Sequence, residues 1–243
     1  MSLIGVISDI HGNLPALNAV LAALVADGVD RIVCCGDLVG YGPWPGEVIA
    51  CMREADIISV QGNHDAATAE ALPRDWFDHD TGSVIEWTRA IIPGAMVAYL
   101  KGLPQTVTEE RFTLVHGSLR GPLWEYVRNT FTAGENFALL SSSLCLFGHT
   151  HLQGGFVRME GRIASLNPAH KALDLLPQAQ YLINPGSVGQ PRDGDPRAAY
   201  AIIDLQHCWV RFGRVTYDID LVMREIKRAG LPSRFADRLA RGR

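Results

Sequence analysis

The sequence predicts an α/β fold with a mostly parallel sheet, because short apolar runs alternate with helical patterns from its start. Three apolar runs, at residues 2–8, 31–35 and 56–60, have the length of buried strands. Between the first two, leucines recur at helical spacing after Asn13, and Gly28 ends the pattern. A shorter helix is expected at 47–54 between the second and third runs.

The rest of the chain predicts more strands and one unusual helical segment. Strands are expected at 111–116, 144–147, 154–158, 161–166, 180–184, 198–204 and 208–216, and helices near 134–142 and 218–229. Residues 66–110 carry helical pieces at 66–72 and 83–100, broken by Pro73, Pro93 and Gly94. We therefore expect a single domain over residues 1–243, with a helical cap at about 66–110 beside the binding crevice.

The composition excludes several classes of protein. A net charge of -4 and an isoelectric point near 6.0 argue against a broad nucleic-acid-binding face. No stretch approaches the ~20 apolar residues that cross a membrane, so no membrane partner is expected. The arginine-rich end, with Arg234, Arg238, Arg241 and Arg243, is expected to be solvated and without function.

The cysteines and the start of the chain predict a cytoplasmic protein. The number of cysteines is odd, at five, and none forms a CxxC pair, so reduced thiols are expected. The first residues have neither a basic segment nor the long apolar stretch of a signal peptide.

Polar residues gather where predicted strands end, and this pattern predicts a site. Parallel sheets bind ligands beyond the carboxyl ends of their strands. Five of the eight histidines fall in five short segments at such ends. The segments are Asp9-Ile10-His11, Gly36-Asp37, Gly62-Asn63-His64-Asp65, His116-Gly117 and Gly148-His149-Thr150-His151.

Carboxylate, amide and imidazole groups without a nearby cysteine suit borderline divalent metals. The D-x-H and H-x-H spacings are expected to place two ligands on one side of an extended segment. A carboxylate such as Asp37 can bridge two cations, and a pair ~3.5–4 Å apart can clamp a phosphate for in-line displacement. Two divalent cations would leave the site positive despite Asp9 and Asp37, so an anionic substrate is expected.

As an ordered set, these segments resemble the signature of the calcineurin-like metallophosphoesterase superfamily. The stretches GDLVGYGPWPGEV and NPGSVGQPRDGDPRAAYAIID are similar to its small prokaryotic YfcE-like and diadenosine tetraphosphatase-related members. The resemblance implies a four-layer α-β-β-α sandwich of the metallo-dependent phosphatase type.

The resemblance also implies a role for each residue. The first metal would be held by Asp9, His11, Asp37 and His151, and the second by Asp37, Asn63, His116 and His149. His64 would bind no metal and would act as general acid toward the leaving oxygen, with Asp65 orienting it. A hydroxide bridging the two ions would attack phosphorus. Manganese is the expected metal, with iron, nickel or zinc as alternatives.

The predicted function is therefore hydrolysis of a small phosphate ester, with phosphodiesters as the first choice. Phosphomonoesters and dinucleoside polyphosphates are the alternative substrates. A catalytically inactive scaffold on the same fold is the non-enzyme alternative, and it is disfavoured because His64 and every expected ligand are present. A metallo-β-lactamase-type hydrolase is disfavoured because its H-x-H-x-D-H pattern is absent. The oligomeric state stays open.

Several residues have two interpretations each. Asn13 is either a helix cap or a phosphate contact, and Tyr41 and Trp44 either stack on a substrate base or pack internally. Residues 184–187 favour a tight turn over a loop that lines the site. The remaining histidines, His79, His170 and His207, are expected to be ordinary surface or core residues.

Overall fold

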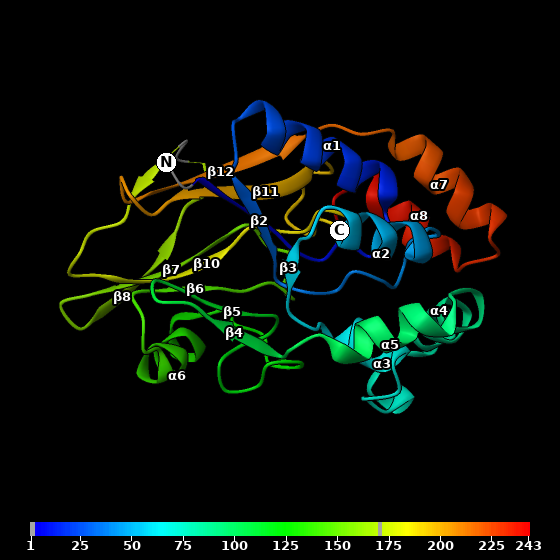
Figure 1. Ribbon diagram of the computed structural model, residues 1–243, viewed down its shortest axis with the longest axis horizontal. Helices are drawn as coiled ribbons and strands as arrows, with labels where there is room; N and C mark the ends of the chain where they lie inside the picture. Colours follow the sequence, from blue (N-terminus) through cyan, green and yellow to red (C-terminus); the bar gives the residue numbers. More distant parts are fainter. Residues whose placement is uncertain (1–2, 170–171) are drawn as a thin grey trace.

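In the computed structural model, which describes residues 3–169 and 172–243, two six-stranded sheets lie face to face (Figure 1). The first sheet has the order β3-β2-β1-β11-β12-β9 and the second β4-β5-β6-β10-β7-β8. The first comprises β1 (Leu3–Ile7), β2 (Arg31–Cys34), β3 (Ile58–Ser59), β9 (Leu173–Asp174), β11 (Ala198–Asp204) and β12 (Trp209–Val215). The second comprises β4 (Thr106–Thr108), β5 (Thr113–Val115), β6 (Leu144–Leu146), β7 (Gly154–Met159), β8 (Arg162–Leu166) and β10 (Gln180–Asn184).

Both sheets are mixed rather than mostly parallel. Strands β1, β2 and β3 run parallel, as predicted, and so do β5, β6 and β10. Strands β7, β8, β11 and β12 pair antiparallel, because connections such as residues 205–208 are too short for a crossover. The carboxyl ends of the parallel strands meet at one edge of the sandwich, which is where the polar segments lie.

Helices cover the outer faces and complete the predicted α-β-β-α layers. Helices α1 (Leu14–Ala26) and α2 (Pro45–Glu54) pack on the first sheet, and α6 (Thr130–Leu139) packs on the second (Figure 1). Between the sheets, β-branched and aliphatic side chains such as Val6, Leu114 and Ile183 form a fully buried core. The α/β class and the layered architecture expected from the sequence are thus confirmed.

The segment predicted as a cap contains α3 (Asn63–Thr68), the 3₁₀ turn η1 (Arg74–Trp76), α4 (His79–Ile91) and α5 (Gly94–Gly102). These helices lie beyond the edge strand β3 (Figure 1). Helix α4 begins earlier than expected because the Asp78 side chain accepts the backbone N–H of Thr81 and caps it. Strand β4, although inside residues 66–110, already belongs to the second sheet.

The arginine-rich end is not a solvated tail, so that expectation is wrong. It forms helix α8 (Ser233–Leu239), whose Phe235 and Leu239 are buried beside α7 (Ile219–Arg228) and α4. Arg234 forms ion pairs with Asp78 and Asp80 at the start of α4. The end of the chain therefore fastens the cap to the sandwich.

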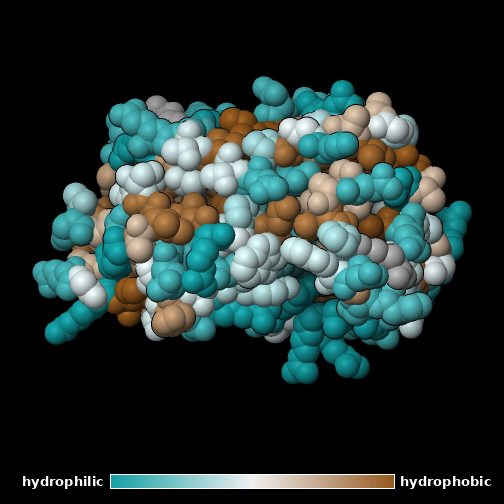
Figure 2. Space-filling view, turned by 90° about the horizontal axis from the view of Figure 1, so that it is seen from below, coloured by the Kyte–Doolittle hydropathy of each residue, from teal (hydrophilic) through white to brown (hydrophobic). Residues whose placement is uncertain are grey.

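The surface carries hydrophobic residues in separate patches among hydrophilic ones on the face seen from below (Figure 2). Within the described part of the chain, no helix has both the length and the apolar character needed to span a bilayer. All five cysteines are free, and Cys34, Cys35 and Cys145 are buried.

Candidate metal centre

The loops that carry the polar segments adopt an uncommon backbone conformation. Positive φ angles occur at five expected ligands: Asp9 (54°), His11 (49°), Asp37 (56°), His149 (64°) and His151 (58°). The expectation that D-x-H and H-x-H are extended is therefore wrong. Non-glycine residues in this region cost about 1–3 kcal/mol each, and such strain gathers at functional sites.

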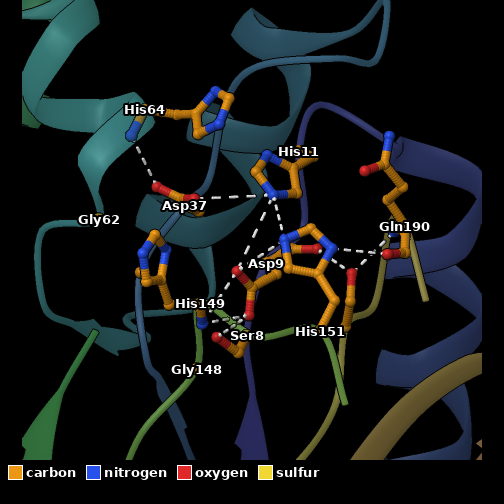
Figure 3. Close-up of polar contacts among 12 residues, drawn as sticks. Ser8, Asp9, His11, Asp37, Gly62, His64, Gly148, His149, His151 and Gln190 are labelled. Atoms are coloured by element: carbon orange, nitrogen blue, oxygen red, sulfur yellow. Dashed lines mark hydrogen bonds and ion pairs between the residues drawn. The ribbon is translucent and has the colours of Figure 1, made fainter. Parts of the chain in front are cut away.

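The first cluster joins the loop after β1 to the loop after β6 (Figure 3). His151 Nε2 lies 3.2 Å from Asp9 Oδ1 and 3.1 Å from His11 Nε2. His11 Nε2 lies 3.9 Å from Asp9 Oδ1. The three side chains are buried, and their donor atoms converge on a common point.

Backbone carbonyls determine which ring nitrogen each histidine presents. His11 Nδ1 lies 3.0 Å from the carbonyl of Val39, and His151 Nδ1 lies 2.6 Å from that of Gln190. A carbonyl only accepts, so both rings donate from Nδ1. Burial is the main cause that lowers the pKa of both histidines, which favours neutral rings. Two Nε2 lone pairs then face each other, an arrangement that a cation between them would stabilise.

The second cluster has the same construction. His116 Nε2 lies 2.9 Å from Asn63 Oδ1 and 3.1 Å from His149 Nδ1. The other ring nitrogen of His116 lies 2.8 Å from the carbonyl of Cys35, so Nε2 again carries a lone pair. Amide oxygen and imidazole nitrogen, both acceptors here, form a donor set for a divalent cation.

Asp37 lies between the two clusters. Its Oδ2 is 3.6 Å from His11 Nε2 and 3.4 Å from His116 Nε2. Burial and the nearby Asp65 and Asp9 raise the pKa of the Asp37 carboxyl well above its usual value. Gly62 permits this position, because a Cβ there would lie 2.0 Å from Asp37 Oδ1.

The structure thus brings all seven expected metal ligands together, six of them buried and Asn63 half-buried. Two groups of three, Asp9 with His11 and His151, and Asp37 with His116 and His149, have ligand atoms within 4.8 Å of one another. The donor chemistry fits divalent cations, while the assignment of each residue as a ligand stays a prediction.

His64 lies beside this assembly. Its backbone N–H donates to Asp37 Oδ1 at 2.9 Å, and its ring packs 5.3 Å from Phe77. Together with His11 and Asp37 it also forms a third group of close ligand atoms. Its Nδ1 is buried and has no hydrogen-bond partner among the described residues, unlike the carbonyl-bound Nδ1 atoms of the first cluster.

Asp65 does not orient His64, so that part of the expectation is wrong. Its carboxylate accepts backbone N–H groups from four residues: Asp37, Leu38, Val39 and Gly62. Helix α3 begins at Asn63, and adjacent helical residues point in different directions. Asp65 therefore holds the Asp37 turn in place rather than the His64 ring.

Residues 184–190 brace the site, a role that the sequence did not reveal. Ser187 Oγ donates to the carbonyl of Asp9 at 2.7 Å, and Asn184 Nδ2 donates to that of Gly148 at 2.8 Å. The segment is neither a simple turn nor a direct lining of the cavity. Asn13, by contrast, caps α1 through the N–H of Ala16.

Sequence reasoning also missed Arg192, which lines the cavity over the two clusters. Its guanidinium contacts the Gln190 side-chain oxygen at 2.8 Å and the Tyr41 hydroxyl at 3.4 Å. No carboxylate in the described ranges pairs with it. The N-P-G-S-V-G-Q-P-R stretch was a signal for this residue, because it follows the bracing segment directly.

Other candidate residues have different surroundings. Tyr41 lines the cavity, with its ring 4.5 Å from His11 and 4.6 Å from His64. Trp44 packs against the hydrophobic cluster of α7 and α8. Exposed His79 contacts Asp80, His207 contacts Asp204, and His170 lies outside the described residues.

Comparisons with known proteins show similarity in sequence and overall fold. The model of the calcineurin-like phosphoesterase superfamily domain matches residues 2–207. An uncharacterised protein of Methanocaldococcus jannaschii is 36% identical, over 100% of this chain and 99% of its own. Phosphodiesterase YfcE of Escherichia coli is 26% identical, over 81% and 84%. A metallophosphoesterase structure from Sphaerobacter thermophilus has 40% identity and a TM-score of 0.87, covering 100% and 99%.

Proposed function

The chain belongs to the calcineurin-like phosphoesterase superfamily, and from this premise we propose that it is a metal-dependent phosphodiesterase with a two-ion centre. The observation that carries the proposal is the position of Asp37 Oδ2. It lies 3.6 Å from a donor nitrogen of the first cluster and 3.4 Å from one of the second. A single carboxylate shared by two donor sets is the geometry that a pair of ions needs.

Bound divalent cations would supply positive charge for the phosphate and lower the pKa of a coordinated water. The chain's own residues position these ions. Asp9, His11 and His151 would hold the first ion with Asp37, and Asn63, His116 and His149 the second. Backbone carbonyls fix the tautomers of His11, His116 and His151 in advance, so these rings need little reorganisation on binding.

His64 is suited to donate a proton to the leaving oxygen. Burial, His151 and Arg192 lower its pKa, so the free enzyme holds it neutral. A bound phosphodiester brings negative charge beside the ring and favours its protonated form. The hydrogen bond from the His64 backbone N–H to Asp37 holds the start of α3 beside the carboxylate that the two clusters share.

A diester is favoured over a monoester by the relatives and by the cavity. The curated relative from Escherichia coli carries the name phosphodiesterase. In this chain, Arg192 contributes a positive charge, and aromatic side chains from the cap and from the segment after β5 give room for a second ester group. Manganese is the metal we expect, in an enzyme acting in the cytoplasm.

The test uses metal-free protein reloaded with Mn²⁺, assayed with bis-p-nitrophenyl phosphate and p-nitrophenyl phosphate. We expect diester cleavage that requires added metal. The variant His64→Ala should lose turnover by roughly 10²–10⁴-fold, the range for a general acid. Its thermal stabilisation by Mn²⁺ should persist, and the exposed His79→Ala should behave like the wild type.

Two results would contradict the proposal at different points. Unchanged turnover in His64→Ala would remove this residue from the mechanism. Mn²⁺ binding without hydrolysis of either ester would favour an inactive scaffold.

A further inference from the structure

The cavity over the metal clusters has aromatic walls on two sides. It encloses about 230 Å³. Trp76 and Phe77 of the cap line it, and so do Trp124 and Tyr126 from the segment between β5 and α6. Two chain segments far apart in the sequence thus each contribute a pair of aromatic side chains.

In each pair, one aromatic ring contacts a histidine of the site. The Tyr126 ring stacks on His149 with centroids 3.9 Å apart and an angle of 10°, and Arg128 covers the ring at 4.0 Å. Phe77 meets His64 edge-on at 5.3 Å. These two rings are part of the wall and support the site histidines.

The other member of each pair, Trp76 in the cap and Trp124 after β5, stacks on no histidine of the site. Trp76 is 57% exposed and Trp124 is 54% exposed, both high for the largest apolar side chain. Neither indole has a ring or cation contact with the described residues. Exposed aromatic surface gathered in a cavity beside a reaction centre indicates a ligand contact.

Trp124 is also held in place. A Cβ on Gly121 would lie 2.7 Å from Cε2 of the indole, so the glycine allows the ring to rest against the backbone. A fixed ring loses little conformational entropy when a ligand stacks on it.

The charges that line the cavity indicate where the phosphate of a substrate would lie and where its uncharged part would lie. Arg192 supplies a positive charge to the cavity, and cations held by the two clusters would add more. On the cap, Asp78 lines the same cavity beside Trp76 and is paired with Arg234. A carboxylate there disfavours a second phosphate near the cap, so an uncharged group fits against the indoles.

We propose that Trp76 and Trp124 bind a nucleobase of the substrate, which makes this enzyme a nucleotide phosphodiesterase. The inference rests on the proposed function, because it takes the phosphate to lie at the metal clusters. The cavity volume suits one nucleoside-sized group rather than a buried polymer. Every base offers a flat π-face, so indoles select for a base without selecting its identity.

The test compares the binding of AMP and ribose 5-phosphate, which differ only by the base, to Mn²⁺-loaded protein by titration calorimetry. One stacked base corresponds to about a 5- to 100-fold difference in affinity. We expect AMP to bind tighter by this factor, and Trp76→Ala and Trp124→Ala each to reduce the ratio. Ribose 5-phosphate should bind all variants equally.

Two further variants distinguish the loss of base stacking on the indoles from a general loss of protein structure. Gly121→Ala should displace the Trp124 indole and lower the AMP preference without changing ribose 5-phosphate affinity. Phe131→Ala removes an aromatic ring that is 74% exposed on α6, outside the cavity, and should keep the full preference.

Equal affinity for the two phosphates in the wild type would overturn the inference, and so would an unchanged ratio in both indole variants. Hexyl phosphate binding as tightly as AMP would also overturn it, because the walls would then select apolar surface rather than a base. Absence of metal-dependent ester hydrolysis would instead contradict the proposed function, and calorimetry would still decide the base preference.

Discussion

Three backbone carbonyls determine the chemistry of the site at the scale of single residues. Those of Val39, Cys35 and Gln190 fix the tautomers of His11, His116 and His151. Each ring then turns a lone pair toward the centre of the assembly. Sequence motifs identify the histidines but say nothing of the carbonyls, because these belong to residues of any type.

Arg192 is the residue at this scale whose contribution is easiest to isolate. Arg192→Ala should lower kcat/KM for a diester by about 10- to 100-fold, the value of a hydrogen bond to a charged group. Its neighbours Gln190 and Tyr41 are uncharged partners, so no carboxylate is left unpaired by the change. Steady-state kinetics with Arg192→Lys as the partial-rescue control measures this.

Stabilisation by Mn²⁺ should be the same in Arg192→Ala and wild type. Loss of metal binding would mean that the arginine supports the clusters instead of the substrate.

The sequence predicts which side chains gather at the site, but not the backbone conformation and hydrogen bonds that position them. The seven expected ligands converge because strand ends of parallel β1–β2 and β5–β6 units meet at one edge. The role of Asp65 was missed because the pattern did not place the start of α3 at Asn63. The left-handed loops at Asp9 and His149 were missed because side-chain types do not reveal φ.

At the scale of elements, the segment from Gly117 to Arg128 depends on one buried carboxylate. Glu125 accepts hydrogen bonds from Ser118 Oγ at 2.6 Å and from Arg120 Nε at 2.9 Å. Asn136 of α6 donates to the same group at 3.4 Å. These contacts tie the segment that presents Trp124 and Tyr126 to the cavity both to itself and to α6.

Glu125→Ala should therefore lower the free energy of unfolding by about 1–3 kcal/mol at pH 7. Burial raises the pKa of Glu125, but Arg120, Ser118 and Asn136 together bring it below the ordinary 4.5. A lowered folded-state pKa means stability that is present above pH 4.5 and lost as the pH falls through the folded value. The effect of the substitution should shrink accordingly in acid.

Urea unfolding of both proteins at pH 7 and at acidic pH measures the difference. Glu135→Ala removes the other, exposed carboxylate partner of Arg120 and should change stability by less than about 0.5 kcal/mol. An effect of Glu125→Ala that is equal at both pH values would exclude the charge as its cause.

The sequence located most elements but not helix α8, which packs against the cap. Strands β10 and β11 lie where the apolar runs predicted them. Helix α8 was missed because its arginines obscure the spacing of Phe235, Ala236 and Leu239, which are buried only against α7 and the cap. The burial of these side chains depends on tertiary packing, which a local sequence pattern does not show.

At the scale of the whole molecule, the candidate metal centre lies between the two sheets. Asp9 and Asp37 follow strands of the first sheet, whereas His116, His149 and His151 follow strands of the second. Cations held between them would stabilise the sandwich as well as supply chemistry. The α/β class was predictable from the sequence because alternation and apolar periodicity are spread over the whole chain, whereas the four-layer arrangement was expected only from the resemblance of its motifs to a known superfamily.

The most direct test of the two-ion centre is anomalous diffraction from crystals of the Mn²⁺-loaded protein. We expect two manganese peaks per chain, about 3.5–4 Å apart, with the Asp37 carboxylate between them. One peak alone, or two peaks too far apart for Asp37 to contact both, would contradict the account.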